Sequence, residues 1–205
     1  MEPSSPGRKP VQERSRERIA RALEVTENLL VSAGPEATSI PEIARISGVP
    51  RASIYQFYPT KYALFSTLAD VHLKKVAEGV RMEAESFADQ SWTRFVEEAV
   101  RRTSAYYNAN PAASILILGG PFSRTSYTLQ EVTLQDIGHQ VREFFARVRP
   151  ELELPEEPDV LTIAVEIAFS CMKHSYFKYS EITDAMADQA ILATVAYLRT
   201  WFEQA

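Results

Sequence analysis

Apolar residues recur at helical spacing along almost the whole chain from about Arg14 onward. In the first such segment, Ile19, Leu23, Leu30 and Ala33 share one side of a helix whose other side carries charges. No stretch shows the alternation typical of a strand, and no repeat of fixed period is present. The pattern therefore predicts an all-α protein, with a small N-terminal three-helix domain and a larger C-terminal helical domain.

The composition is that of a globular protein. The 205 residues are 45% apolar and 24% charged and include one cysteine, which excludes both a disordered chain and a disulfide-stapled secreted scaffold. Residues 1–18 are too polar for a secretory signal. The uncharged run Thr103–Ser123 contains Asn, Pro and Gly, so it is interpreted as buried segments rather than a membrane span. We expect a cytoplasmic protein.

Charge is distributed unequally along the chain. Residues 1–62 carry 9 Lys and Arg against 7 Asp and Glu, whereas residues 63–205 carry 13 against 20. Six of the basic residues fall within the first 21 positions, and prolines interrupt residues 1–12. We expect residues 1–12 to be a disordered basic arm, which is either a solvated tail or able to touch phosphates.

Glycine and proline residues divide the segment from about residue 13 to residue 62 into short helices. Gly34, expected as a left-handed cap, and Pro35 end the first helix. Ser39 with Glu42 forms a capping box for the second helix, which Gly48 ends. A third helix follows over 51–58, and Thr60 caps a longer helix from Lys61 to about Ala84. Two short helices joined by a Gly-containing turn predict a helix-turn-helix at 13–62, ahead of a helical domain at 63–205.

The stretch from Arg16 to Leu68 resembles the DNA-binding domain of the tetracycline-repressor (TetR) family of transcriptional regulators. The features that match, in order, are Gly34, Thr38-Ser39-Ile40, Ile43-Ala44, Gly48-Val49, Ile54-Tyr55, Tyr58, Lys61 and Leu64. The chain departs from the family at Pro50, which has no side-chain acceptor to cap the third helix, and at Ala52, where Gly is common.

The resemblance assigns roles in DNA binding. It implies that Tyr55, Lys61 and Thr60 contact the phosphate backbone, and that Ser39 touches a phosphate as well as capping its helix. At the start of the third helix, Arg51, Ala52, Ser53 and Gln56 face outward, and all but Ala52 are candidate base readers. The alternatives are a core tyrosine at 55, a solvated lysine at 61 and a capping role alone for Ser39.

The last two helices, expected over Asp159–Tyr179 and Thr183–Glu203, are apolar on two sides. Since one side covers the domain core, we expect the other to form a twofold interface with a second copy of the chain. The residues assigned to this interface are Ile167, Cys171, Ala190, Thr194, Tyr197 and Trp201.

The resemblance also implies a small-molecule pocket in the C-terminal domain. Large aromatic and flexible side chains fit an apolar or aromatic ligand, and the candidates are Tyr106, Tyr107, Phe122, Tyr127, Phe144, Met172, His174 and Phe177. Glu166, Ser170 and His174 form a polar line on an apolar helix, which faces either a ligand cavity or a partner subunit. Cys171 and His174 have no further ligands nearby, so we expect neither a metal nor another cofactor.

These features favour a regulator over an enzyme. The three histidines, at 72, 139 and 174, are far apart in the sequence, and no glycine loop or nucleophile motif accompanies them. The prediction is a homodimeric repressor that binds a palindromic operator in double-stranded DNA and is released by a small apolar or aromatic ligand, with no membrane partner. The alternative is a helical protein that binds a small molecule or a protein partner without binding an operator.

Overall fold

The structure is a computed structural model that describes residues 11–86 and 91–202, and within these ranges the regular structure is helical, as predicted. The chain divides into two compact units, the first ending at Phe65 and the second beginning at Ser66. Among the described residues, no helix is both long and apolar enough to cross a membrane.

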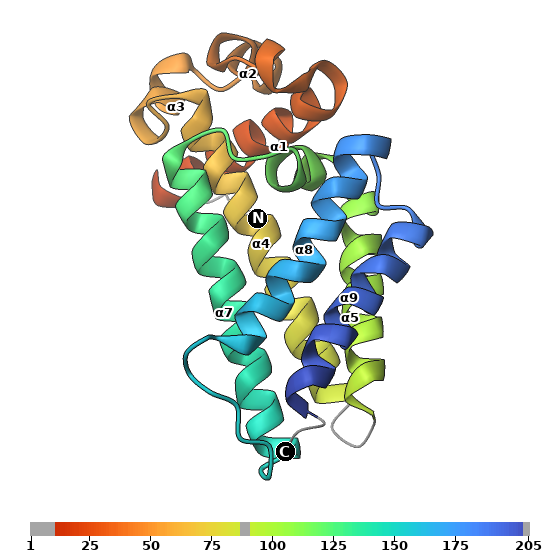
Figure 1. The fold of residues 1–205 in the computed structure, drawn as a ribbon. Coiled ribbons are helices and arrows are strands. Elements are labelled where there is room, and N and C mark those ends of the chain that lie inside the picture. The colour runs from red at the N-terminus through yellow and green to blue at the C-terminus, as the bar shows by residue number, and fades with distance from the viewer. Residues whose placement is uncertain (1–10, 87–90, 203–205) are drawn as a thin grey trace, which may run out of the picture. The chain divides into compact units, whose positions relative to one another are not determined.

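The first unit contains α1 (Val11–Ala37), α2 (Ile40–Ser47), α3 (Arg51–Phe57) and the start of α4 (Lys61–Ser86). Helix α1 packs against α2, which packs against α3 (Figure 1). Of the arm expected to be disordered over residues 1–12, residues 1–10 lie outside the described ranges. The last two positions differ from that expectation because α1 already begins at Val11.

The first helix is interrupted at Gly34, as predicted, but by a different backbone geometry. Gly34 has φ 80° and ψ 167°, a conformation essentially restricted to glycine and distinct from the left-handed cap that we expected. Thr38 then bonds back to the Gly34 carbonyl through its backbone N–H, at 3.2 Å, and its hydroxyl, at 2.8 Å. This places the chain to begin α2 two residues later.

Local side-chain and backbone features set the ends of α2. The Ser39 hydroxyl accepts a hydrogen bond from the Glu42 N–H at 3.4 Å, while the Glu42 carboxylate pairs with Arg45. Only half of the predicted capping box therefore forms. At the other end Gly48 adopts the left-handed conformation, with φ 67° and ψ 13°, as a helix C-cap favours. Ile43 is buried on the inner side of this helix.

The second unit contains α5 (Trp92–Ala109), α6 (Pro111–Ala113), the π-helical turn η1 (Ser114–Leu118), α7 (Arg124–Val148), α8 (Val160–Tyr179) and α9 (Asp184–Phe202). Helix α8 contacts α7 and α9, and α9 contacts α5 (Figure 1). The sequence also offers Ser91 as a cap for α5, but in the structure its hydroxyl bonds to that of Thr93 and caps no backbone N–H, so this expectation is wrong.

Helices α7 and α8 cross closely at Gly138. A methyl group on this residue would lie 2.8 Å from both the backbone N and Cα of Thr162, which is closer than any normal contact. Beside the crossing, Asp159 caps α8 by accepting bonds from the Thr162 N–H at 3.4 Å and hydroxyl at 2.6 Å. Arg142 bonds to the same carboxylate at 3.1 Å and to the Pro155 carbonyl at 3.1 Å, so it fixes the loop that leads into α8.

The turn between α8 and α9 is held by side chains. Ser180 adopts the left-handed conformation at φ 61°. The Asn108 amide makes two bonds of 2.8 Å to the backbone N–H and carbonyl of Ile182, and this attaches the end of α5 to the turn. Ser175 donates to the Glu181 carbonyl and accepts from the Thr183 N–H.

Candidate functional site

Helix α3 presents a row of polar side chains to solvent. Arg51, Tyr55 and Gln56 are exposed, as is Ala52, whereas Ile54 on the opposite side is only 2% exposed. Ser53 is half-buried. The buried Ile54 anchors the helix while the outward row remains accessible, which is the arrangement that a helix needs in order to contact base edges.

The start of α3 has no side-chain cap, as the proline at its N-cap predicted. The Pro50 carbonyl accepts the N–H groups of Ser53 at 2.9 Å and Ile54 at 3.2 Å. At the other end the Tyr58 N–H donates to the Ile54 carbonyl at 2.8 Å. Helix α3 is therefore held by its own backbone and by Ile54, and its exposed side chains are not needed to form it.

Tyr55 and Ser39 take up two different environments. The Tyr55 side chain is 46% exposed, so it is not the core tyrosine that formed the alternative interpretation. Ser39 is half-buried and its hydroxyl is engaged with the Glu42 N–H, so the capping role is present in the structure. Any phosphate contact by Ser39 would have to share that hydroxyl.

The start of α4 offers a capped and exposed helix terminus. Thr60 is exposed, and its hydroxyl accepts a hydrogen bond from the Ala63 N–H at 3.3 Å. A helix N-terminus carries partial positive charge and attracts anions such as phosphate. Thr60 and the first N–H groups of α4 thus have the chemistry that the resemblance implies for a phosphate contact.

Lys61 has a structural role that the sequence did not reveal. Its ammonium donates to the carbonyl oxygens of Pro35, at 2.9 Å, and Glu36, at 3.2 Å. Two of its three N–H bonds therefore go to carbonyls in the last turn of α1, which a lysine is well suited to cap. The solvated lysine of the alternative interpretation does not describe this geometry.

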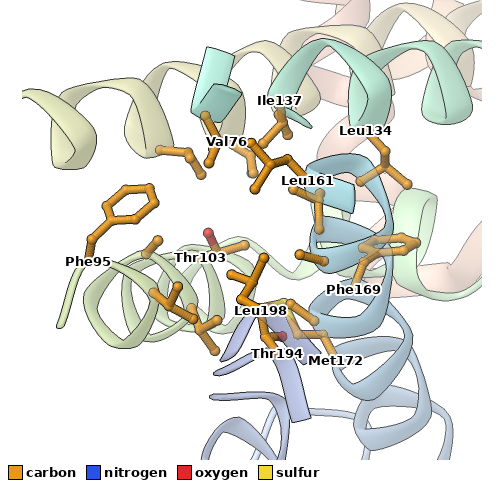
Figure 2. Close-up of a pocket in the computed structure, with 18 of the residues that line it drawn as sticks. Val76, Phe95, Thr103, Leu134, Ile137, Leu161, Phe169, Met172, Thr194 and Leu198 are labelled. Carbon is orange, nitrogen blue, oxygen red and sulfur yellow. The ribbon is translucent and has the colours of Figure 1, made fainter. Parts of the chain in front are cut away.

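A second candidate site is an apolar cavity of about 100 Å³ within the second unit (Figure 2). Five helices, α4, α5, α7, α8 and α9, contribute its walls. Aliphatic and phenylalanine side chains make up most of the lining, and none of the lining residues is charged. The polar residues among them are Thr103, Tyr107 and Thr194, and burial raises the pKa of the Tyr107 phenol, which keeps it neutral.

The cavity includes two of the residues predicted to bind a ligand. Tyr107 and Met172 line it, whereas Phe144 is buried against the lining residue Phe95 with ring centroids 5.2 Å apart. Tyr106 lies outside the lining, and its hydroxyl is 2.7 Å from His72 Nδ1. The remaining four do not line the cavity: Phe122 is half-buried, and Tyr127, His174 and Phe177 are exposed.

The lining is mainly aliphatic, so the aromatic residues predicted to bind a ligand make up little of it. Helix α7 contributes Leu134, Ile137 and Val141, and α8 contributes Leu161 and Ala164. The available signal was the apolar periodicity of these two helices, which shows which residues point inward but not that a space remains between them.

The residues assigned to a subunit interface fall into two groups. Ile167, Cys171, Tyr197 and Trp201 are half-buried. Ala190 and Thr194 are covered by the chain's own helices, with exposed fractions of 0% and 5%, so their side chains cannot add area to an interface.

An outward stripe on α8, which we call the α8 stripe, comprises Ile163, Ile167, Cys171, His174 and Phe177. Ile163, His174 and Phe177 are exposed, and Phe177 is 87% exposed. In the polar line that includes His174, Ser170 is exposed as well, and burial raises the pKa of the Glu166 carboxyl. None of the three lines the cavity.

In the part of the chain that the structure describes, no three His, Cys, Asp or Glu side chains form a metal site.

Comparison with known proteins points to one family both for the sequence of the N-terminal segment and for the fold. Residues 18–68 match the family model described as bacterial regulatory proteins, tetR family. A TetR-family transcriptional regulator from Streptomyces coelicolor is 20% identical, with a TM-score of 0.61 over 90% of this chain and 99% of that one. A TetR family transcriptional regulator from Thermus thermophilus is 17% identical, with a TM-score of 0.55 over 87% and 94% of the two chains.

At these identities the two structures show a shared fold. No curated protein matches the sequence.

Proposed function

The chain belongs to the tetR family of bacterial regulatory proteins through its helix-turn-helix DNA-binding domain, and on that premise we propose that it is a homodimeric repressor. It binds a palindromic operator and leaves it when a small molecule occupies the cavity of the second unit. The observation that carries the proposal is the exposed row Arg51, Tyr55 and Gln56 on a short helix that Ile54 anchors.

The exposed row divides into base-reading and phosphate-binding side chains. Arg51 and Gln56 are donor-rich and can pair with guanine and adenine edges in the major groove, and Ser53 can contact either. The methyl group of Ala52 can pack on a thymine methyl. Tyr55 fits a phosphate contact because its side chain is exposed and carries a hydroxyl group.

Three further groups at the helix ends complete the phosphate contacts. Thr60 lies at the positive end of α4, and Lys61 brings a cation to the same helix start. Ser39 stands at the N-terminus of α2. Contacts of this kind set the position of the domain on DNA, while the base contacts determine which sequence it prefers.

The second unit supplies the twofold symmetry that a palindrome requires. The α8 stripe leaves Ile163 and Phe177 exposed on a helix that is apolar on its other sides as well. An apolar stripe without a cover within its own chain is typical of a subunit interface. We assign the interface to this stripe together with Tyr197 and Trp201 of α9.

The proposed dimer has two states that differ in the distance between its DNA-binding domains. Release requires that the ligand bind one of these states more tightly than the other. A molecule with equal affinity for both states would shift nothing, however tightly it bound. The cavity is suited to such a role because five helices contribute to it, so filling it changes how they pack.

Selection of bound sequences from a random duplex library tests the DNA-binding part of the proposal. We expect an enriched palindrome with half-sites about one helical turn, or a multiple of it, apart. A Gln56→Ala variant should select a sequence changed at one position of each half-site, and Tyr55→Phe should select the same sequence with lower affinity. Failure of the wild-type chain to enrich any sequence would contradict the proposal and favour a helical binding protein without an operator.

A further inference from the structure

The cavity of the second unit contains one buried polar atom that is left without a partner. Thr194 is 5% exposed and lines the cavity, and its Oγ1 makes no hydrogen bond within the described residues. In the described ranges, Ser104 Oγ and Gln140 Oε1 are also buried without a hydrogen-bond partner, but neither residue lines the cavity.

The unpaired hydroxyl differs from other helical threonines in the same chain. Thr26 donates to the Ala22 carbonyl at 2.7 Å, and Thr133 donates to the Leu129 carbonyl at 2.8 Å, each one helical turn back. This bond is the usual way in which a buried threonine satisfies its hydroxyl. Thr194 does not make it. Because an unpaired buried hydroxyl is unfavourable, a molecule in the cavity that bonds to Oγ1 would gain an interaction the empty protein lacks.

The rest of the lining excludes a charged occupant. The walls consist of side chains such as Val76, Ile137, Leu161 and Leu198, and no lining residue carries a charge (Figure 2). A carboxylate or ammonium group in such surroundings would lose its hydration without an opposite charge to replace it. Apart from Thr194, the polar lining residues are Thr103 and Tyr107, so few directional bonds are available.

The size of the cavity limits the occupant further. At about 100 Å³ it is smaller than the engineered cavity of about 150 Å³ that binds benzene. An occupant must therefore be compact, close to a single small ring or a short branched chain, unless the helices move apart to admit it.

We propose that the cavity binds a compact, uncharged and mostly apolar molecule with a single hydrogen-bonding group, and that Thr194 Oγ1 is the partner of that group. The regulatory meaning of this binding rests on the proposed function above, but the binding itself does not depend on it. Thr194 is thus a specificity residue for the ligand rather than the interface residue that the sequence predicts.

Three ring compounds test the proposal: phenol and toluene, which are nearly equal in size and differ in the hydroxyl group, and benzoate, which carries a charged carboxylate. Titration calorimetry on the full chain without DNA measures the affinity of each. We expect phenol to bind at least five-fold more tightly than toluene, and benzoate to show no binding over the same concentration range. Equal affinity for benzoate and phenol would overturn the proposal.

Variants at position 194 test the assigned hydrogen bond. Thr194→Val replaces the hydroxyl by a methyl group of similar size, so it should weaken phenol at least five-fold and leave toluene within about two-fold. Thr194→Ser should keep the preference for phenol. The matched control is Thr133→Val, which removes a helical hydroxyl outside the lining and should change neither affinity. Unchanged phenol affinity in Thr194→Val would refute the role of Thr194.

A separate assay distinguishes this inference from the proposed function. Operator binding is measured with and without phenol by the change in fluorescence anisotropy of a labelled duplex. Operator binding combined with no phenol binding would refute the inference and leave the regulator intact. Phenol binding that depends on Thr194, in a chain that binds no DNA, would support the inference and refute the regulator.

Discussion

Substitution of Gly138 by alanine should force α7 and α8 apart. The added methyl group would lie 2.8 Å from the backbone N and Cα of Thr162, whereas ordinary contacts begin at 3.4 Å. The Thr162 hydroxyl also opposes the methyl group, but because two of the three nearest atoms belong to the backbone, rotation of the Thr162 side chain cannot relieve the clash. The two helices must separate by roughly half an ångström, which also disturbs the Asp159 cap on Thr162.

The expected loss of stability follows from three contributions. Overpacking against a rigid neighbour costs about 1–3 kcal/mol, and a weakened helix cap adds about 1 kcal/mol. The higher helix propensity of alanine offsets about 1 kcal/mol of this. Gly138→Ala should therefore lower the free energy of unfolding by about 2 kcal/mol, measured by urea denaturation and followed by circular dichroism.

Gly79→Ala is the matched control because Gly79 also lies inside a long helix, α4. A methyl group there would meet only the Arg102 Cδ atom, at 4.0 Å. The same substitution should consequently raise the free energy of unfolding by up to about 1 kcal/mol. The reasoning would be refuted if Gly138→Ala were as stable as the wild-type protein, or if the two variants changed stability in the same direction.

Three further predictions concern pH, assembly and DNA. Burial alone would raise the pKa of Asp159, but hydrogen bonds from Thr162 and Arg142 outweigh it and lower the pKa below its ordinary value. The stabilisation by this carboxylate is therefore complete above about pH 4 and is lost as the pH falls through the lower folded-state pKa. Asp159→Asn should lower the urea midpoint at pH 7 and lower it less at pH 3. Phe177→Asp, on the exposed α8 stripe, should convert a dimer into a folded monomer in sedimentation velocity experiments. Lys61→Met should weaken binding to all DNA sequences about equally, reduce the salt slope of log K by roughly one, and destabilise the first unit by about 1–3 kcal/mol through loss of its two carbonyl bonds.

Each of these predictions can fail in a distinct way. An equal effect of Asp159→Asn at both pH values would mean that the carboxylate contributes nothing through its charge. A Phe177→Asp variant that still sediments as a dimer would remove the α8 stripe from the interface. An unchanged salt slope in Lys61→Met would leave Lys61 with a structural role only, which the same urea titration would measure.

Helix ends could be predicted from the sequence because each depends on one or two residues. Gly48 ends α2 with a backbone conformation that few other residues adopt, and the Thr60 hydroxyl caps α4 as expected. Gly34 was correctly identified as a break, although its ψ of 167° was not foreseen. These features are local, so neighbouring sequence is sufficient to identify them.

Long-range packing could not be predicted in the same way. Periodicity identified two apolar sides on the last helix, but not which of them the chain covers itself. Ala190 and Thr194 were assigned to a partner and are instead buried within the chain. The aromatic residues Tyr127 and Phe177 were assigned to the ligand cavity and are exposed. The close crossing at Gly138 left no signal, because a glycine inside a helix does not indicate what approaches it.

The two bonds that hold Lys61 to the end of α1 also have an entropic consequence. A lysine side chain loses up to about 2 kcal/mol of conformational entropy when it is ordered. A lysine that moves freely on the surface loses this entropy only when it binds DNA, and the loss then lowers the affinity for DNA. Because the Lys61 ammonium is already bonded to the Pro35 and Glu36 carbonyls, much of the loss occurs when the domain folds. Under the proposed phosphate contact of Lys61, this one side chain links the stability of the first unit to the affinity for DNA.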